Sequence, residues 1–416
     1  MKEVLVIGGG VIGLCSAYYC AHRGANVTVL ERGSADDRGC SYGNAGMIVP
    51  SHFVPLAAPG MVALGLKWMW NPESPFYIKP RLNAALIGWG MKFWHAATPA
   101  HVQKSAPFLR DLHLASRECF ETIAATIGSD FGLVKQGLLM LCKSEHALAE
   151  EIDAAKVARA LEIPAEVLSP PQIAKLDPDV TMNVAGGIYY PHDCHLSPDR
   201  FMQSLKQELR RLNVRMLWNT EVTGWQTANG RIQAAVTSDG EIVANEYVLC
   251  GGSWSPILAK SLKISIPMQA GKGYSLTLQH PRQLPNICAI FAEARVAVTP
   301  MGGTLRFGGT MEMAGINEEI NKRRVDGIIK AIPGYYPNFR PSDFDDIQPW
   351  CGLRPCSPDG LPYIGRTASY RNLTIASGHA MMGLSLAPIT GKLVSQILND
   401  EKPPIDLRLV NPDRYS

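Results

Sequence analysis

The chain has 416 residues, of which 46% are hydrophobic and 19% are charged. At roughly 150 residues per domain this length suggests two or three domains, and the composition excludes a disordered, collagen-like or coiled-coil chain. Forty lysines and arginines against 37 acidic residues leave a net charge of +3 without a dense basic stripe. We therefore expect no nucleic-acid partner.

Ten cysteines are scattered along the chain without a Cys-x-x-Cys pair or a matching histidine cluster. This pattern indicates neither a zinc site nor a disulfide framework. Several of the cysteines, such as Cys15 and Cys250, lie in apolar runs, where a reduced cysteine behaves as a small buried hydrophobe. The N-terminus lacks the basic region of a signal peptide. We expect no metal and a cytoplasmic protein.

The first thirty residues predict a βαβ unit, with strands at 3–7 and 26–30 and a helix between them. Gly8 allows the tight turn after the first strand, Gly10 allows a pyrophosphate to approach the backbone, and Gly13 allows the helix to pack closely on the strand. The N-terminus of the helix would then receive the phosphates.

An acidic residue completes this pattern. Glu31 follows the second strand, where a carboxylate can accept hydrogen bonds from ribose hydroxyls, and Arg32 stands beside it. A glycine triplet alone also occurs in turns that bind nothing, but the strand before it, the helix after it and the acidic residue supply the context of a nucleotide site. The sequence predicts an adenine dinucleotide and leaves NAD and FAD open at this point.

The pattern changes between Ser51 and about Thr181 to loops punctuated by proline and to amphipathic helices, including one around Pro107–Ile127. Residues 65–97 in this inserted segment contain no run long enough to span a bilayer. They do collect aromatic side chains, namely Trp68, Trp70, Trp89, Phe93 and Trp94. These side chains form either a surface-seeking apolar face with aromatic anchors or ordinary buried helices.

Strand-like alternation returns in two blocks. The first block, which we expect to rejoin the nucleotide domain, comprises residues 214–218, 220–225, 232–237 and 241–248. The second block, expected to form the antiparallel sheet of a substrate domain before a polar helix at 317–332, comprises residues 275–278, 289–299 and 304–310. A strand at 373–376 and a helix at about 383–399 close the chain.

Segments far apart in the sequence resemble one family, the FAD-dependent D-amino-acid oxidase superfamily. They are VIGGGVIGLCSAYYCAHRGANVTVLER (6–32), CSYGNAGM (40–47), GLRPCSPDGLPYIG (352–365) and SGHAMMGLSLAPITGKLVS (377–395). Four further segments are most similar to its bacterial D-amino-acid dehydrogenase branch, which includes D-hydroxyproline dehydrogenases. They are LAAPG (56–60), HDCHLSPDR (192–200), KGYSLTL (272–278) and RFGGTMEMAG (306–315).

The resemblance implies an α/β fold with a Rossmann-like FAD-binding domain and an α+β substrate domain built on an antiparallel sheet. It implies that the FAD-binding domain is discontinuous, made of 1–50, 186–265 and 345–416, and that the substrate domain is made of 51–185 and 266–344. Some relatives attach flavin through a cysteine near the C-terminal motif. Neither Cys351 nor Cys356 falls on that position, so we expect noncovalent FAD.

The resemblance also implies which residues contact the FAD. The backbone amides of the turn from Gly378 to Ser385, a predicted helix start, would face the pyrimidine ring, because reduction places negative charge there. The implied FAD-contacting residues are Gly8, Gly10, Val11, Ile12, Gly13, Glu31, Arg32, Ser41, Asn44, Ala45, Gly46, Met47, Val222, Gly251, Gly252, Trp254, Gly378, His379, Met381, Met382, Gly383 and Leu384. For the methionines and the histidine, core filling and a satisfied loop position are the competing interpretations.

Arg354 is the predicted anchor for a substrate carboxylate, because a guanidinium offers a planar fork to two oxygens and stays charged. A structural ion pair is the competing interpretation. Tyr274 and His52 are weaker candidates for the substrate pocket. No residue is predicted as a certain catalytic acid or base, since a neutral amine can pass hydride directly to flavin N5 when it is well positioned.

The implied activity is oxidation of a D-amino acid to the imine, with electrons passed to a quinone or another carrier. Candidate substrates are D-proline, cis-4-hydroxy-D-proline and D-alanine. Three alternatives stay open: an oxygen-using glycine or sarcosine oxidase, a flavoprotein subunit of a larger electron-transfer complex, and a nicotinamide-dependent dehydrogenase. Peripheral contact with the inner face of a membrane, through residues 65–97, would bring the protein to a quinone.

Overall fold

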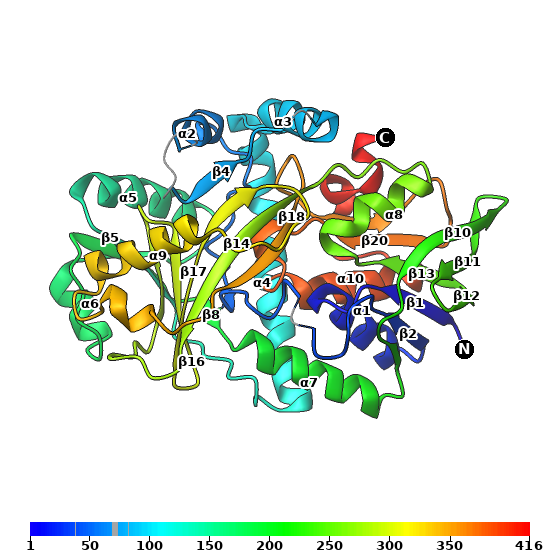
Figure 1. Cartoon of the computed structure of the whole chain (residues 1–416), viewed down its shortest axis with the longest axis horizontal. Coiled ribbons are helices and arrows are strands. Elements are labelled where there is room, and N and C mark those ends of the chain that lie inside the picture. Colours follow the sequence, from blue (N-terminus) through cyan, green and yellow to red (C-terminus); the bar gives the residue numbers. More distant parts are fainter. Residues whose placement is uncertain (38, 69–73, 82) are drawn as a thin grey trace.

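The computed structural model describes residues 1–37, 39–68, 74–81 and 83–416. Two large sheets lie side by side along the long axis of the molecule (Figure 1). The six-stranded sheet lies beside both termini, and the nine-stranded sheet occupies the other half. Trp70, one of the aromatic residues of the predicted apolar face, lies outside the described residues.

The six-stranded sheet contains the predicted βαβ unit. Its strands run in the order β19 (Tyr363–Arg366), β20 (Leu373–Ser377), β13 (Glu246–Leu249), β1 (Glu3–Ile7), β2 (Asn26–Leu30) and β9 (Arg215–Leu217). The pairs from β20 to β9 are parallel and only β19 is antiparallel. Strands from both ends and from the middle of the sequence therefore form one mostly parallel, Rossmann-like sheet.

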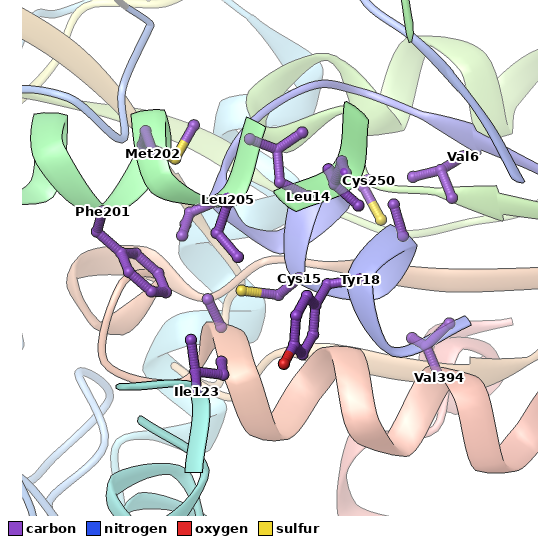
Figure 2. Close-up of a cluster of buried hydrophobic side chains, with 14 of the residues drawn as sticks. Val6, Leu14, Cys15, Tyr18, Ile123, Phe201, Met202, Leu205, Cys250 and Val394 are labelled. Atoms are coloured by element: carbon purple, nitrogen blue, oxygen red, sulfur yellow. The ribbon is translucent and has the colours of Figure 1, made fainter. Parts of the chain in front are cut away.

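Helix α1 (Val11–His22) is buried between this sheet and three other helices. Figure 2 shows its side chains Leu14, Cys15 and Tyr18 packed among residues of the neighbouring elements. Those elements are α4 (Pro99–Ile127), α7 (Pro198–Arg211), α10 (Ala387–Leu398) and β1. Because α1 is apolar on nearly every side, burial from all directions stabilises it more than its own amphipathicity does.

The nine-stranded sheet forms the second half of the molecule. Its strands are β18 (Trp350–Cys356), β14 (Gln269–Leu278), β17 (Thr304–Met313), β16 (Val296–Met301), β15 (Cys288–Phe291), β5 (Leu138–Cys142), β7 (Gly186–Tyr190) and β6 (Glu166–Leu168), with β4 (Phe76–Ile78) paired to β17. Strands β7 and β18, which the predicted domain boundaries grouped with the FAD-binding domain, pair within this sheet.

The remaining elements complete the two halves. The helices are α2 (Met61–Trp68), α3 (Ala84–Ala96), α5 (Glu145–Ala160), α6 (Pro170–Leu176), α8 (Ser255–Ser261) and α9 (Lys322–Tyr335). The small sheets are β10 (Val222–Ala228), β11 (Arg231–Thr237) and β12 (Gly240–Ile242) on one side, and β3 (Met47–Ile48) with β8 (Cys194–His195) on the other.

The predicted fold class, an α/β protein with a Rossmann-like domain, is confirmed. The second sheet was predicted to be antiparallel and is mixed instead, because β15 pairs with β5, and β17 with β4, in parallel. Four predicted elements are wrong in detail. The strand expected at 241–248 is two strands, β12 and β13, which belong to different sheets. The strand expected at 289–299 is two strands, β15 and β16, because the chain turns at Arg295 with φ of +53°. Helix α9 begins at Lys322 instead of residue 317, and α10 begins at Ala387 instead of about 383.

None of the helices within the described ranges combines the length and the apolar character that crossing a bilayer requires. The aromatic residues of segment 65–97 divide between two environments. Trp89 is buried, stacks on Phe93 and donates its indole N–H to the Cys356 carbonyl at 2.9 Å. Trp94 is 64% exposed. The interpretation of a buried helix therefore holds for Trp89, whereas Trp94 lies at the surface.

Candidate active site

One large cavity, of about 1110 Å³, runs from the glycine-rich turn after β1 to the β14–β17–β18 edge of the second sheet. It is lined by nearly all of the predicted site residues. They are Gly8, Gly10, Val11, Ile12, Glu31, Arg32, Ser41, Asn44, Ala45, Met47, His52, Val222, Gly251, Gly252, Trp254, Tyr274, Arg354, His379, Met381, Met382, Gly383 and Leu384. Gly13, Gly46 and Gly378 do not line it; they lie behind its wall.

The glycine-rich turn has the tight geometry that the sequence predicts. Gly8 has φ of +112°, and a Cβ there would lie 2.4 Å from the Cys250 carbonyl oxygen. A Cβ at Gly13 would lie 1.9 Å from the Gly8 carbonyl oxygen. At Gly10, by contrast, a Cβ would meet only Ser41 Oγ, at 3.5 Å. Protein packing alone therefore does not demand glycine at position 10, whereas close approach of a phosphate to the helix N-terminus does.

Glu31 is fixed at the cavity wall by backbone amides. Its carboxylate accepts hydrogen bonds from Gly9 N at 2.7 Å and Gly33 N at 2.9 Å. The guanidinium of its neighbour Arg32 lies 3.6 Å over the ring of Trp254, a cation–π contact. These contacts fix the Glu31 carboxylate and the stacked side chains of Arg32 and Trp254. They lie on the side of the cavity where a ribose and an adenine would bind.

The loop that carries Ser41 to Met47 is held in place from the second sheet. Arg306 on β17 donates to the carbonyl oxygens of Tyr42 and Asn44 at 2.9 and 2.8 Å. Ser41 Oγ accepts from Val11 N at 3.0 Å, at the start of α1. The loop therefore connects the two halves of the molecule across the cavity.

The turn before α10 differs from the prediction. Residues Ala380–Met382 form a short 3₁₀ turn, and Met382 N donates to the His379 carbonyl at 2.9 Å, so this amide does not face the cavity freely. The reason is that Ala380 adopts φ of +49°, which reverses the chain before the helix begins. The prediction that the backbone amides of this turn face the flavin is therefore wrong for the amide of Met382.

His379 is 1% exposed and its Nε2 lies 3.0 Å from Thr390 Oγ1. Burial lowers the pKa of its imidazole to about 3. The ring is therefore neutral at physiological pH and is held by a helix residue. Its Nδ1 is buried without a hydrogen-bond partner among the described residues, so the interpretation of a fully satisfied loop histidine holds for only one of the two ring nitrogens.

Arg354 on β18 points its guanidinium along the cavity wall. Its Nη1 donates to the Thr310 carbonyl oxygen at 2.6 Å. No carboxylate forms a salt bridge with it among the residues that the structure describes. Burial lowers the pKa of the guanidinium below its usual range, yet an arginine stays charged at any working pH. The competing interpretation of a structural ion pair thus receives no support, and a cation remains available to an anionic ligand.

Two residues that the sequence did not single out position this arginine. Thr310 has φ of +66°, a strained conformation for a β-branched residue, at an irregularity in the β14–β17 pairing. The strain turns its carbonyl toward Arg354. A Cβ at Gly273, on β14, would lie 2.1 Å from Nη1 and from Nη2 of Arg354. Strain at such a position typically persists where it serves a function.

Tyr274 lines the cavity, but its hydroxyl is already engaged. The hydroxyl donates to Glu312 Oε2 at 2.6 Å and accepts from Asn321 N at 3.3 Å. Burial, followed by the Glu312 carboxylate, raises the pKa of Tyr274. Lys272, beside it, is 2% exposed and donates to Asn317 Oδ1 and the Glu319 carbonyl, so it is not a solvated lysine. Tyr274 therefore presents its ring rather than a free hydroxyl.

His52 is half-buried at the cavity wall. Its Nδ1 lies 3.2 Å from Ser51 Oγ, and burial lowers the pKa of its imidazole to about 4. The nearby cation of Arg295 adds to this shift. His52 is thus a neutral imidazole within reach of a cavity ligand.

The cavity fits an elongated dinucleotide that carries a flavin. At one end it offers the N-terminus of α1, where the N-cap residue Gly10 has no side chain, with a carboxylate next to it. At the other end it offers a wall of backbone, methionine and aromatic groups beside a charged arginine. No cluster of three or more metal-ligating side chains occurs in the described part of the chain. The cavity thus has a glycine-rich turn at one end and a guanidinium without a carboxylate partner among the described residues at the other.

Comparison with known proteins agrees with this geometry. Residues 3–397 match the family described as FAD dependent oxidoreductase. The chain is 31% identical over 423 residues to a D-amino acid dehydrogenase of Bradyrhizobium diazoefficiens, covering 100% of this chain and 99% of that protein. It is 30% identical to a D-amino acid dehydrogenase of Helicobacter pylori, covering 96% and 95% of the two chains.

Solved structures share the fold. Glycine oxidase from Geobacillus kaustophilus superposes with a TM-score of 0.80 at 22% identity, covering 100% of both chains. L-proline dehydrogenase from P. horikoshii superposes with a TM-score of 0.75 at 17% identity, covering 100% of this chain and 97% of the other. The cofactor is FAD, and the chain belongs to the family of FAD-dependent oxidoreductases named DAO.

Proposed function

We propose that the protein is a FAD-dependent D-amino-acid dehydrogenase. The observation that carries this proposal is the guanidinium of Arg354, which borders the cavity with a backbone carbonyl, and no carboxylate, as its hydrogen-bond partner in the described chain. A cation in this state favours an anionic ligand with two oxygens, such as the carboxylate of an amino acid. The similarity to D-amino acid dehydrogenases supports the choice of enantiomer.

The chain's residues would hold FAD, noncovalently, along the whole cavity. The start of α1 at Gly10 would hold the diphosphate, Glu31 would accept from ribose hydroxyls, and the loop held by Arg306 would contact the ring system. When bound, FAD supplies the acceptor for the hydride that leaves the substrate Cα. Cys356 is buried and bonded to the Arg354 carbonyl, which supports noncovalent binding.

The substrate end of the cavity would orient the amino acid. Arg354, fixed by Thr310 and Gly273, holds the carboxylate, and the ring of Tyr274 packs beside it. Because positioning contributes most of the rate in such a reaction, these contacts matter more than a strong base.

For the substrate we propose a D-amino acid whose side chain is small or closed into a ring, with D-proline, cis-4-hydroxy-D-proline and D-alanine as candidates. His52 is a candidate for contact with a polar group of the substrate, because its Nε2 has no hydrogen-bond partner among the described residues. The hydroxyl of Tyr274 is bonded to Glu312, so it is a weaker candidate for that contact.

We further propose that electrons leave to a quinone or another carrier and that the protein touches the inner face of the membrane from the cytoplasmic side. Helices α2 and α3 lie together at one edge of the molecule (Figure 1). Helix α3 exposes Ile87, Met91 and Trp94 by 53%, 56% and 64%, and α2 contributes Trp68 to the cavity wall. An apolar face next to the cavity suits an apolar electron acceptor.

The domain division is also a proposal. The FAD-binding domain would comprise the six-stranded sheet with α1, α7, α8 and α10, drawn from 1–50, 186–265 and 345–416, and the substrate domain would comprise the rest, with β7 and β18 of the nine-stranded sheet at the boundary. The cavity lies where the two meet.

Turnover of the purified yellow protein tests the function. We expect reduction of a soluble quinone by D-amino acids and little hydrogen peroxide in air. Rapid peroxide formation from glycine or sarcosine would instead favour the oxidase alternative, to which the fold similarity with glycine oxidase belongs. Absence of turnover with every amino acid would favour an electron-transfer subunit.

A further inference from the structure

We propose that Asp193, Ser51 and His52 form a proton relay that accepts the ammonium proton of the substrate. This inference rests on the proposed function and adds the residues that prepare the amine. An α-amino acid binds in water as the ammonium, whereas loss of hydride from Cα requires the nitrogen lone pair to form the C=N bond. A proton must therefore leave the nitrogen before or during the reaction, and the site needs a group to receive it.

The fold brings the three residues together from distant parts of the sequence. Strands β3 and β8 pair antiparallel, with Met47 opposite His195 and Ile48 opposite Cys194. This register places the segment that follows β3 beside the turn that precedes β8. Ser51 and Asp193, which are 142 positions apart in the sequence, consequently make two hydrogen bonds.

The hydrogen bonds define one direction for the relay. Ser51 Oγ donates to Asp193 Oδ2 at 2.5 Å, and Ser51 N donates to Asp193 Oδ1 at 3.1 Å. The serine hydroxyl has one hydrogen, so toward His52 Nδ1, 3.2 Å away, it acts as the acceptor. The imidazole therefore carries its proton on Nδ1, and its Nε2 keeps a free lone pair.

The outer end of the relay borders the cavity. Ser51 and His52 both line it, whereas Asp193 is fully buried behind them. Val49, two residues before Ser51, donates its N–H to Ser385 Oγ at 3.0 Å, at the end of the turn whose backbone borders the proposed flavin site. The backbone that carries His52 is thus held against the turn that borders the proposed flavin site, and His52 and Ser385 line the same cavity.

The proton transfer balances without any other reactant. The substrate N–H bond breaks as a bond forms to His52 Nε2, the Nδ1–H bond breaks as a bond forms to Ser51 Oγ, and the serine O–H bond breaks as a bond forms to Asp193 Oδ2. The result is a neutral amine and a neutral carboxylic acid. His52 is neutral before and after, and only its tautomer changes.

The electrostatics of the site support this route. Burial raises the pKa of Asp193 to about 7, against the lowering effect of its bonds from Ser51. Burial lowers the pKa of His52 to about 4, which disfavours an imidazolium as the final proton carrier. The charged or titratable groups that face Asp193 are Arg117 of α4, Tyr190 of β7, Cys194 of β8 and Cys288 of β15, and those that face His52 are Arg295 and His113.

A pair of ligands that differ only in the amino group tests the relay without turnover. 2-Aminoisobutyrate has no Cα–H and is not oxidised, and isobutyrate is the same acid without the nitrogen. Both are titrated into the oxidised holoenzyme between pH 5 and 8, with the visible spectrum of the bound flavin as the readout. As the pH is raised toward 7, we expect the affinity for 2-aminoisobutyrate to rise about tenfold per pH unit and then to level off. The reason is that Asp193 can accept the ammonium proton only when its carboxylate is ionised. The affinity for isobutyrate should stay nearly constant.

Four variants assign the effect. Asp193→Asn and Ser51→Ala should make the affinity for 2-aminoisobutyrate as flat with pH as that for isobutyrate. Ser51→Thr, which keeps the hydroxyl, and Asp153→Asn, an exposed carboxylate on α5, should behave as the wild type. If Asp193→Asn loses its FAD, the Ser51→Ala and Ser51→Thr pair decides alone, since Ser51→Ala keeps the backbone bond to Asp193.

The two possible failures are distinct. Equal and flat pH dependence of both ligands in the wild type, or an unchanged slope in Ser51→Ala, overturns the relay and leaves the proposed function standing. If neither ligand perturbs the flavin spectrum or competes with a D-amino acid, the anchoring of an amino-acid carboxylate is wrong, and the proposed function falls together with the relay.

Discussion

Gly273 lies directly beneath the guanidinium of Arg354: a Cβ on this glycine would be 2.1 Å from both Nη1 and Nη2. The two residues belong to neighbouring strands, β14 and β18, in a pairing that sets Gly273 opposite Gly352 and Gly271 opposite Arg354. The flat face of the arginine therefore depends on the absence of a side chain on the next strand. The proposed carboxylate anchor therefore needs both strands, β18 for the arginine and β14 for the glycine that leaves room for it.

Replacement of Gly273 by alanine should weaken substrate binding, since the guanidinium must move away from Thr310. Overpacking of this kind costs about 1–3 kcal/mol, so we expect the Kd for a carboxylate ligand to rise about tenfold. Gly224→Ala is the matched control, because a Cβ there has its nearest neighbour at 3.9 Å. Ligand titrations that give the two variants equal affinity would contradict the account of the anchor.

Removal of the charge at Arg354 should act more strongly. Arg354→Met loses charge-assisted hydrogen bonds worth about 1.5–3 kcal/mol each, so kcat/KM should fall at least about a hundredfold. Arg354→Lys should recover only part of this loss, because an ammonium lacks the fork geometry. Arg408→Met, at a 90% exposed arginine, should have the kinetics of the wild type. An Arg354→Met enzyme with unchanged KM would exclude Arg354 as the carboxylate anchor.

Glu31→Ala should reduce the amount of FAD that copurifies with the protein. The substitution removes the acceptor of two backbone amides and the proposed partner of the ribose. We expect the Kd for FAD to rise about tenfold or more, since each bond to a charged group contributes about 1.5–3 kcal/mol. The flavin-to-protein absorbance ratio after dialysis measures this effect. Glu162→Ala, at a 91% exposed side chain, is the control, and equal FAD retention in the two variants would count against the assignment.

His113 should make the protein less stable in acid. It is fully buried, its Nδ1 lies 2.9 Å from Ser385 Oγ, and burial lowers its pKa to about 3. Below about pH 6.5 the unfolded chain therefore binds a proton that the folded chain does not, and the stability that the neutral ring confers at higher pH is lost as the pH falls toward 3. His113 alone contributes a slope of up to about 1.4 kcal/mol per pH unit.

Urea unfolding of His113→Asn between pH 6.5 and 4.5 tests this expectation. The free energy of unfolding of the variant should vary less steeply with pH than that of the wild type, by about the slope of one proton. His146→Gln, at an 86% exposed side chain, should leave the slope unchanged. An identical slope in His113→Asn and the wild type would show that the ring does not stay neutral in the fold.

Local motifs were the part of the site that the sequence predicts well. The glycine-rich turn, Glu31 and the loop around Ser41 are encoded by residues near one another in the chain, so their geometry follows from backbone rules. The tight packing at Gly8 and Gly13 agrees with the prediction. Arg354 could be named as a candidate because its motif is contiguous, and it borders the cavity.

Contacts that depend on strand register could not be predicted from the sequence. Thr310 and Gly273 reach Arg354 only through the irregular pairing of β14 with β17 and β18. Asp193 meets Ser51 only because β3 pairs with β8. The sequence made Tyr274 a candidate for the substrate pocket but did not show that its hydroxyl is bonded to Glu312, which lies 38 residues away. A single sequence shows which residues could pair but not the register that brings them together.

The most direct test of the central claim is to mix the purified yellow protein anaerobically with D-proline, cis-4-hydroxy-D-proline, D-alanine, glycine, sarcosine and the L-enantiomers, and to follow the flavin absorbance near 450 nm. We expect rapid bleaching by at least one D-amino acid and none by its L-enantiomer. Bleaching by L-amino acids alone, or by none of the compounds, would contradict a D-amino-acid dehydrogenase.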